Sequence, residues 1–233
     1  MANDRTSSVA SPRTRLLLTL LAAAGLCGAA QASGGPPEPR SCQFTAFVEE
    51  TDPAGLNVRA APSATAQVLG QLPPVWSDGS GLRVRARVTV TGTANGWFRI
   101  KDGADEETIT EQPARPAYAG EGWVSGRKLV VKSQANLGRT RPDAKAPIAV
   151  QLKDDLLFDG DSTIAAGRLS DCQGNWVQVD FDETRFSTDM KPYLQIKPAA
   201  RSGQPKGHFR AWLNQICGIQ ETSCDGLASA DTP

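Results

Sequence analysis

The chain has 233 residues, enough for one large domain or two small ones. It carries 25 basic and 25 acidic residues, so it lacks the excess positive charge of nucleic-acid-binding proteins and of proteins that bind anionic membranes. It has one histidine, which leaves few side chains for a metal centre or for acid–base catalysis.

The N-terminus has the three parts of a secretory signal peptide, which we place at residues 1–32. Two arginines precede an apolar run over residues 16–26, and Ala30 and Ala32 form an A-x-A cleavage site before Ser33. The apolar run is much shorter than the ~20 residues that a membrane span needs. We therefore expect cleavage and export, to the periplasm or the exterior of a bacterium.

Cleavage changes the remaining composition little. It removes three arginines and one aspartate, so the mature chain has a net charge of about −2. Residues 33–41, which include GGPPEPR, are expected to form a flexible tail. We expect no nucleic-acid partner and no membrane span after signal cleavage.

The mature chain retains four cysteines: Cys42, Cys172, Cys217 and Cys224. An even number in an exported chain predicts two disulfides. A zinc site is the alternative, but the sequence has no C-x-x-C pair and no histidine close to a cysteine pair. The fifth cysteine, Cys27, follows Leu26, where lipoprotein signals resemble one another in having a small residue, so we expect no lipid anchor.

The chain contains an internal repeat. Three pairs of segments match in the same order: residues 59–72 with 139–152, 95–102 with 174–181, and 121–129 with 210–218. The first pair is identical at six of fourteen positions without a gap. Ordered matches at a nearly constant offset indicate a duplicated unit, which we divide into copy one (residues 42–132) and copy two (residues 133–224). The repeat makes Trp97 equivalent to Trp176 and Trp123 equivalent to Trp212.

The repeated unit has the pattern of short strands. Apolar residues alternate with polar ones in CQFTAFVEE, and again from Leu82 to Val90. No long amphipathic helical pattern occurs after the signal peptide, and about 90 residues per copy fit a small barrel or sandwich. In copy two, residues 158–167 (FDGDSTIAAG) are expected to begin the central strands.

Copy one carries three motifs in a fixed order. Asn57, Arg59 and Pro62 belong to NVRAAP, which is followed by GWFRI around Trp97 and GWVSG around Trp123. In this order they resemble the bacterial SH3 domain, a small barrel that an N-V-R-x-x-P segment opens and a G-W-V strand closes. For Arg59 and Pro62 the resemblance implies scaffold roles, hydrogen bonds to loop carbonyls and a fixed turn. A tryptophan can fill much of so small a core.

Copy two departs from this pattern. Leu137 and Gly138 stand where copy one has Asn-Val, and Asn175 and Ala211 replace the glycines that precede its tryptophans. The expected architecture is all-β, two tandem SH3-like small β-barrels after a cleaved signal peptide. The expected parts are a bacterial SH3-like domain at 42–132, a diverged SH3-like domain at 133–224 and a C-terminal tail at 225–233.

The sequence offers little for catalysis. His208 is expected in a solvated loop just before a strand, and paired cysteines leave no thiolate nucleophile. The acidic run DGADEE, residues 102–107, is expected to be solvated loop surface. Residues 154–161 (DDLLFDGD) lack the residue order of a calcium-binding loop and are expected to form a turn. We expect no catalytic residue, no metal ligand and no cofactor.

The family resemblance implies an exported, non-catalytic binding protein that recognises peptidoglycan or an envelope protein. The alternative is a cell-envelope hydrolase with an unrecognised site in the second half. Trp76, in a Pro/Gly-rich loop of copy one, and Tyr118 are candidate ligand contacts, because exposed loop aromatics can anchor a ligand. The competing interpretation is that the Trp76 ring folds back onto its own barrel.

Two disulfide arrangements remain open. Antiparallel pairing of the strands that carry Trp176 and Trp212 would bring Cys172 and Cys217 together, leaving Cys42 to pair with Cys224. This is the arrangement we expect. The alternative is a local Cys217–Cys224 loop with Cys42–Cys172 joining the two copies.

Overall fold

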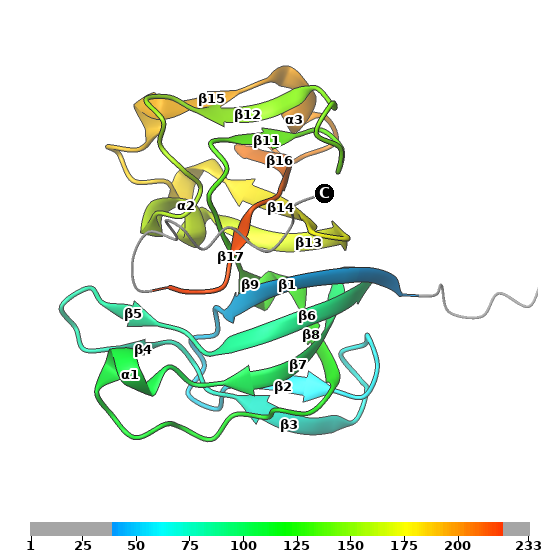
Figure 1. Cartoon of the computed structure of the whole chain (residues 1–233), viewed down its shortest axis with the longest axis vertical. Coiled ribbons are helices and arrows are strands. Elements are labelled where there is room, and N and C mark those ends of the chain that lie inside the picture. The colour runs from blue at the N-terminus through cyan, green and yellow to red at the C-terminus, as the bar shows by residue number, and fades with distance from the viewer. Residues whose placement is uncertain (1–38, 221–233) are drawn as a thin grey trace, which may run out of the picture. The chain divides into compact units, whose positions relative to one another are not determined.

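A computed structural model of the chain describes residues 39–220 (Figure 1). The expected signal peptide, most of the expected tail at 33–41, Cys224 and the C-terminal tail lie outside these residues. Short helices apart, the regular elements are strands, so the all-β prediction is confirmed. No helix within residues 39–220 is both long enough and apolar enough to cross a membrane.

Copy one is built mainly from strands. They are β1 (Arg40–Val48), β2 (Leu56–Arg59), β3 (Val68–Leu72), β4 (Trp76–Ser77), β5 (Arg83–Val84), β6 (Arg87–Ala94), β7 (Trp97–Ala104), β8 (Gly122–Ser125) and β9 (Leu129–Val130). Its short helices are α1 (Glu107–Thr110) and the 3-10 helix η1 (Gly126–Lys128). Seven strands form one sheet in the order β3-β2-β8-β7-β6-β1-β9, and β4 and β5 form a separate hairpin.

Copy two has a comparable set of strands. They are β10 (Lys132–Ser133), β11 (Leu137–Arg139), β12 (Ile148–Leu152), β13 (Gly167–Gln173), β14 (Trp176–Asp182), β15 (Leu194–Ile196), β16 (His208–Leu213) and β17 (Ile216–Cys217). Its helices are α2 (Asp161–Ala166), η2 (Glu183–Arg185), η3 (Lys191–Tyr193) and α3 (Pro198–Arg201). Six strands form a sheet in the order β13-β14-β16-β11-β12-β15, while β10 pairs with β17.

The alternation that predicts strands also predicts much of the core. Val84, Ala86, Val88 and Val90 are at most 1% exposed. Leu82, expected on the same face, is 43% exposed because it lies in the turn between β4 and β5, before the strand begins. The stretch from 161 to 166 is also not a strand as expected. It forms α2, which buries Thr163, Ile164 and Ala166 on one face.

The two sheets repeat the same register. Arg59 pairs with Val68 beside a β-bulge in copy one, and Arg139 pairs with Ile148 beside the same bulge in copy two. Arg59 also pairs with Trp123, as Arg139 does with Trp212. The duplicated sequence therefore folds into a duplicated pattern of strand pairing.

The repeated arginines make the same contact in each copy. Arg59 donates from Nη1 to the Ala66 carbonyl at 2.8 Å, and Arg139 donates from Nη1 to the Ala146 carbonyl at 2.9 Å. The first bond closes the loop between β2 and β3, and the second closes the loop between β11 and β12. Both arginines thus hold backbone in place, as was expected of Arg59.

A tryptophan was expected to fill much of each small core, but Trp97 and Trp176 do not take this place, because both are only partly buried. Because side chains alternate along a strand, burying Phe98 in β7 and Val177 in β14 turns the preceding tryptophans outward. Trp123 and Trp212 are buried, at 9% and 6% exposure, but they lie outside the main apolar cluster. The expected antiparallel pairing of β14 with β16 is confirmed, and β7 pairs with β8 in the same way.

Closed barrels are not observed. Among the described strands, β3 and β9 form opposite edges of the first sheet, and β13 and β15 form opposite edges of the second. Both sheets thus remain open. Most of the buried apolar residues of both copies belong to one continuous cluster, and β13 packs against β1, β6, β9 and η1. The copies therefore share a core surface rather than forming two separate barrels on a linker.

The disulfide prediction requires correction. Cys42 is bonded to Cys172, with a Cα–Cα distance of 5.9 Å, so the expected pairs Cys172–Cys217 and Cys42–Cys224 are wrong. Cys172 lies on β13, which packs against β1, and this contact between copies brings it to Cys42. Cys217 is also disulfide-bonded.

Candidate functional site

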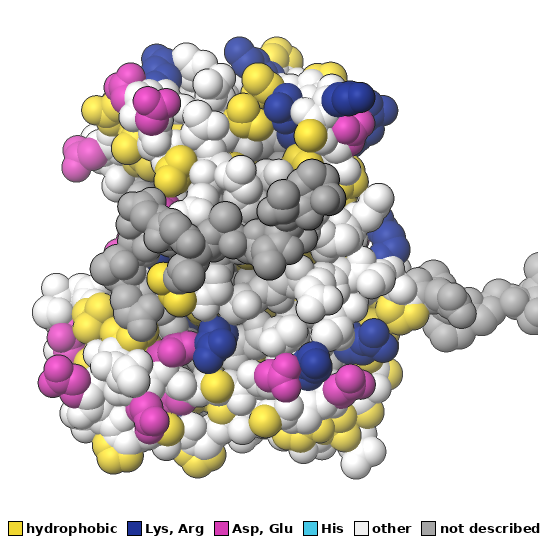
Figure 2. Space-filling view, in the orientation of Figure 1, with side chains coloured by type: hydrophobic (Ala, Val, Ile, Leu, Met, Phe, Trp, Pro, Cys, Tyr) yellow, Lys and Arg dark blue, Asp and Glu magenta, His cyan; other side chains and the backbone are white. Residues whose placement is uncertain are grey.

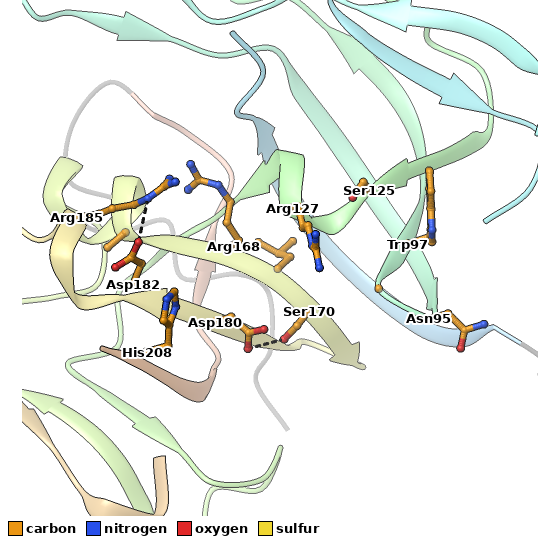
Figure 3. Close-up of a pocket in the computed structure, with 13 residues that line it drawn as sticks. Asn95, Trp97, Ser125, Arg127, Arg168, Ser170, Asp180, Asp182, Arg185 and His208 are labelled. Atoms are coloured by element: carbon orange, nitrogen blue, oxygen red, sulfur yellow. Dashed lines mark hydrogen bonds and ion pairs between the residues drawn. The ribbon is translucent and has the colours of Figure 1, made fainter. Parts of the chain in front are cut away.

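A cleft of about 700 Å³ opens between the two copies (Figure 3). Copy one contributes Asn95, Gly96, Trp97, Ser125 and Arg127. Copy two contributes Ala166, Arg168, Leu169, Ser170, Asp180, Asp182, Arg185 and His208. The cleft exists only because the copies pack together, and it combines one large aromatic ring with several charged side chains.

The copy-one wall is a tight turn supported by a short helix. Asn95 and Gly96 have positive φ angles of 52° and 76°, the conformation that an Asn-Gly hairpin turn requires. The Gly126 N–H donates to the Gly96 carbonyl at 2.9 Å, which ties η1 to this turn. The turn presents Trp97 and η1 presents the exposed Arg127, so both side chains line the cleft.

On the copy-two wall, Asp180 is held by two side chains. Arg210, its cross-strand neighbour, donates from Nε to Oδ1 and from Nη2 to Oδ2, the latter at 2.9 Å. The Ser170 hydroxyl donates to Oδ1 at 3.1 Å. The hydrogen bond to Asp180 raises the pKa of Arg210. The negative charge of Asp180 is therefore already neutralised by the protein.

Asp182 is similarly satisfied. Its Oδ1 accepts hydrogen bonds from the Thr184 hydroxyl at 2.7 Å and the Thr184 N–H at 2.9 Å, while Arg185 Nε lies 3.4 Å from Oδ2. The Thr184 hydrogen bonds, and next the charges of His208 and Arg185, lower the pKa of Asp182. His208 stands directly across the strand pair from Asp182.

Arg168 belongs to a cluster of arginines around one carboxylate. The Glu49 carboxylate accepts hydrogen bonds from Arg85 Nε at 2.5 Å and from Arg83 Nη2 at 2.8 Å. Arg168 Nη2 lies 3.9 Å from Oε1 of the same carboxylate. Burial of Glu49 would raise the pKa of its carboxyl, but Arg85 and then Arg83 and Arg168 outweigh burial and lower it. Arg168 belongs to this partly buried cluster and also lines the cleft.

The position of His208 differs from the expectation. It is not in a solvated loop but is the first residue of β16, partly buried and lining the cleft. The only signal in the sequence is its proximity to a strand. Its pairing with Asp182 depends on a register between strands more than 20 residues apart, which the local sequence does not specify.

The predicted aromatic ligand contacts lie outside this cleft. Trp76 starts the β4–β5 hairpin, pairs with Val84 and is partly buried. The ring of Tyr118 packs on Gly70, where an added Cβ would lie 2.3 Å from its Cδ2 atom, and its hydroxyl donates to the Glu121 carbonyl at 3.2 Å. For both residues, ligand binding stays a prediction.

The acidic run DGADEE was expected to be solvated loop surface, and this is wrong for Asp105. The Asp105 side chain is 1% exposed and accepts hydrogen bonds from the Arg115 N–H, Nε and Nη2 at 2.7–2.9 Å. Burial opposes ionisation of Asp105, but the Arg115 hydrogen bonds outweigh it and lower the pKa. This ion pair closes the insertion between β7 and β8.

Within residues 39–220, no three His, Cys, Asp or Glu side chains gather into a group that could hold a metal ion. Comparisons of the whole chain with protein-family models, with curated proteins and with solved structures find no match. Any functional conclusion therefore rests on the residues and their geometry.

Proposed function

We propose that the chain is an exported, non-catalytic binding protein of the bacterial cell envelope. Its ligand, peptidoglycan or an envelope protein, binds in the cleft between the two copies. The observation that carries this proposal is the cleft itself, which places a partly exposed tryptophan opposite several arginines. Concave sites with an apolar face and a few convergent polar groups are typical of ligand binding.

The envelope assignment is supported by the sequence resemblance to bacterial SH3 domains and by the signal-peptide pattern. The motif residue Arg59 and its equivalent Arg139 make matching hydrogen bonds, which is consistent with two related units of this kind. A disulfide between Cys42 and Cys172 is compatible with export, because disulfides persist in oxidising compartments.

One observation favours the alternative hydrolase: Ser170, Asp180, Asp182 and His208 line the same cleft. Their contacts argue for binding instead. A serine nucleophile needs its hydroxyl bonded to a base that can take the proton. Here the acceptors near the Ser170 hydroxyl are Gln178 and Asp180, the Asp180 carboxylate is already paired with Arg210, and no hydrogen bond joins Ser170 to His208 among the described residues.

The repeat supplies a matched pair of variants for the test. Trp97→Ala removes the aromatic ring from the cleft, whereas Trp176→Ala removes the equivalent ring of copy two, which does not line it. In pull-downs with purified peptidoglycan, we expect Trp97→Ala to weaken binding about tenfold or more and Trp176→Ala to have little effect. Thermal melts by circular dichroism establish that both variants fold.

Equal binding by the wild type and Trp97→Ala would contradict the cleft as the site. A loss confined to Trp76→Ala would place the site at the β4–β5 hairpin instead. The alternative is tested by incubating the wild type with peptidoglycan and measuring released fragments. Time-dependent release that His208→Ala abolishes would establish hydrolysis and overturn the non-catalytic assignment.

A further inference from the structure

The geometry points to an oxyanion site in the cleft: we infer that Arg168, Arg185 and Arg127 hold a carboxylate or phosphate group of the ligand while Trp97 packs against its body. This inference rests on the proposed function, because it assigns the chemistry of the ligand that occupies the same cleft. It follows from the charge balance, from the bonding of the arginines and from the state of the neighbouring carboxylates.

Positive charge is in excess beside the cleft. Among the described residues, Arg83, Arg85 and Arg168 surround the single carboxylate of Glu49, and Arg185 has only Asp182. Burial lowers the pKa of Arg168; Glu49 opposes this, while the charges of Arg185, Arg85 and Arg83 lower it further. An arginine stays charged in a protein, so the lowered pKa of Arg168 shows that its positive charge is partly desolvated and repelled by the neighbouring arginines. A bound anion would offset that repulsion.

Arg168 is oriented before any ligand arrives. Its Nη1 group donates to the backbone carbonyls of Ala165 and Gly167 at 3.0 and 2.5 Å, and within the described region its hydrogen bonds all come from this nitrogen. The distance of 3.9 Å from Nη2 to Glu49 is too long for a hydrogen bond. Donors on Nε and Nη2 are thus available, on a side chain that the backbone already holds.

The other two arginines are freer to contact a ligand. Figure 3 shows the guanidinium groups of Arg168 and Arg185 on neighbouring elements, with Arg127 projecting between them and Trp97. The Arg127 side chain is exposed and makes no hydrogen bond or ion pair in the part of the chain that the structure describes. Figure 2 shows both acidic and basic side chains on the visible face, so an excess of positive charge is not a general property of that surface.

The carboxylates of the cleft do not favour a cationic ligand. Asp180 is paired with Arg210 and Ser170, and Asp182 with Thr184 and Arg185. A ligand cation would have to displace these partners, whereas an oxyanion can use donors that are already present. Trp97 adds a large, partly buried surface on which an apolar or planar part of the ligand can pack.

The test uses the full chain with its disulfides formed and three probes at constant ionic strength. The probes are inorganic phosphate, the dipeptide alanyl-alanine with a free carboxylate, and its C-terminal amide. Nuclear magnetic resonance follows the Trp97 indole N–H and the arginine Nε–H signals. We expect saturable shifts at Trp97 and at the cleft arginines with at least one anionic probe, and none with the amide.

The variants are Arg127→Gln and Arg185→Gln, and the control is Arg141→Gln, which removes the same charge from an exposed position outside the cleft. Each cleft variant should weaken anion binding about tenfold, the effect of one charge-assisted hydrogen bond, and the control should not. Binding of alanyl-alanine identifies a carboxylate ligand. Binding of phosphate alone identifies a phosphate ligand, with the oxyanion site intact.

The inference is overturned if neither anion shifts these signals, or if all three variants bind as the wild type does. Its failure can be told apart from failure of the proposed function. Peptidoglycan binding that is lost in Trp97→Ala but kept in both arginine variants contradicts the oxyanion site alone. Anion binding in the cleft without binding to peptidoglycan or an envelope protein contradicts the envelope partner alone.

Discussion

The turns at Asn95–Gly96 in copy one and Gly174–Asn175 in copy two occupy equivalent positions but have different neighbours. In copy one the turn is open and forms a wall of the cleft. In copy two, Gly174 accepts a hydrogen bond from Gln43 N–H at 3.0 Å and donates to the Ser41 carbonyl at 3.1 Å. The two copies thus contain equivalent hairpin turns with different roles. The copy-two turn is hydrogen-bonded to copy one, whereas the copy-one turn lines the cleft between the copies.

The contact between the copies near the Gly174 turn, which includes the Cys42–Cys172 disulfide, should contribute most to the free energy of unfolding. Replacing Cys42 and Cys172 together by serine removes a cross-link with a sequence separation of 130. We expect the free energy of unfolding to fall by about 2–5 kcal/mol, because the unfolded chain regains the freedom that the bond restricts. Urea unfolding of the exported protein measures this loss.

Arg40→Gln is the control for that experiment. It removes the ion pair between Arg40 and Asp171 beside the disulfide, a 2.7 Å contact in which the Arg40 side chain is 58% exposed. Such a pair contributes at most about 1 kcal/mol. An unchanged stability in the double cysteine variant would mean that packing of β13 on β1, rather than the bond, joins the copies.

The arginine contacts test what the copies share. Arg59→Ala and Arg139→Ala each remove a charge-assisted hydrogen bond to a loop carbonyl, and each should cost about 1.5–3 kcal/mol. Arg141→Ala, in the loop of copy two and exposed, should cost little. Urea unfolding compares the three, and a large cost at Arg59 with none at Arg139 would show that the matching contacts are not energetically equivalent.

The sequence was sufficient to predict the features that recur within each copy. Alternation predicted the buried faces of β1 and β6, and the repeat predicted which strands are equivalent. It was insufficient where the two copies meet. The cross-link from Cys42 to Cys172, the partial exposure of Trp97 and the location of His208 in the cleft depend on which face of each sheet the other copy covers. Local periodicity shows that a strand has two faces but does not show what covers each one.

The smallest expected effect concerns the charge that crosses between the copies. The pKa of the Glu49 carboxyl is lowered from its ordinary value of 4.5 because Arg85, Arg83 and, from copy two, Arg168 outweigh its burial. A carboxyl with a lowered folded-state pKa adds stability that is present above the unfolded-state value and lost as the pH falls through the lower folded-state value. The wild type should therefore lose stability progressively below about pH 4.5, as Glu49 becomes protonated.

Glu49→Gln should make this acid loss less steep, since the variant has no charge to lose at that position. Glu107→Gln is the control, because Glu107 is exposed and has no ion pair within the described residues. Urea unfolding between pH 7 and pH 3 gives the three curves. If stability falls with decreasing pH equally steeply in the wild type, Glu49→Gln and Glu107→Gln, the arginines around Glu49 do not couple the copies electrostatically. A slope that decreases only for Glu49→Gln would show that one carboxylate offsets the repulsion among arginines contributed by both copies.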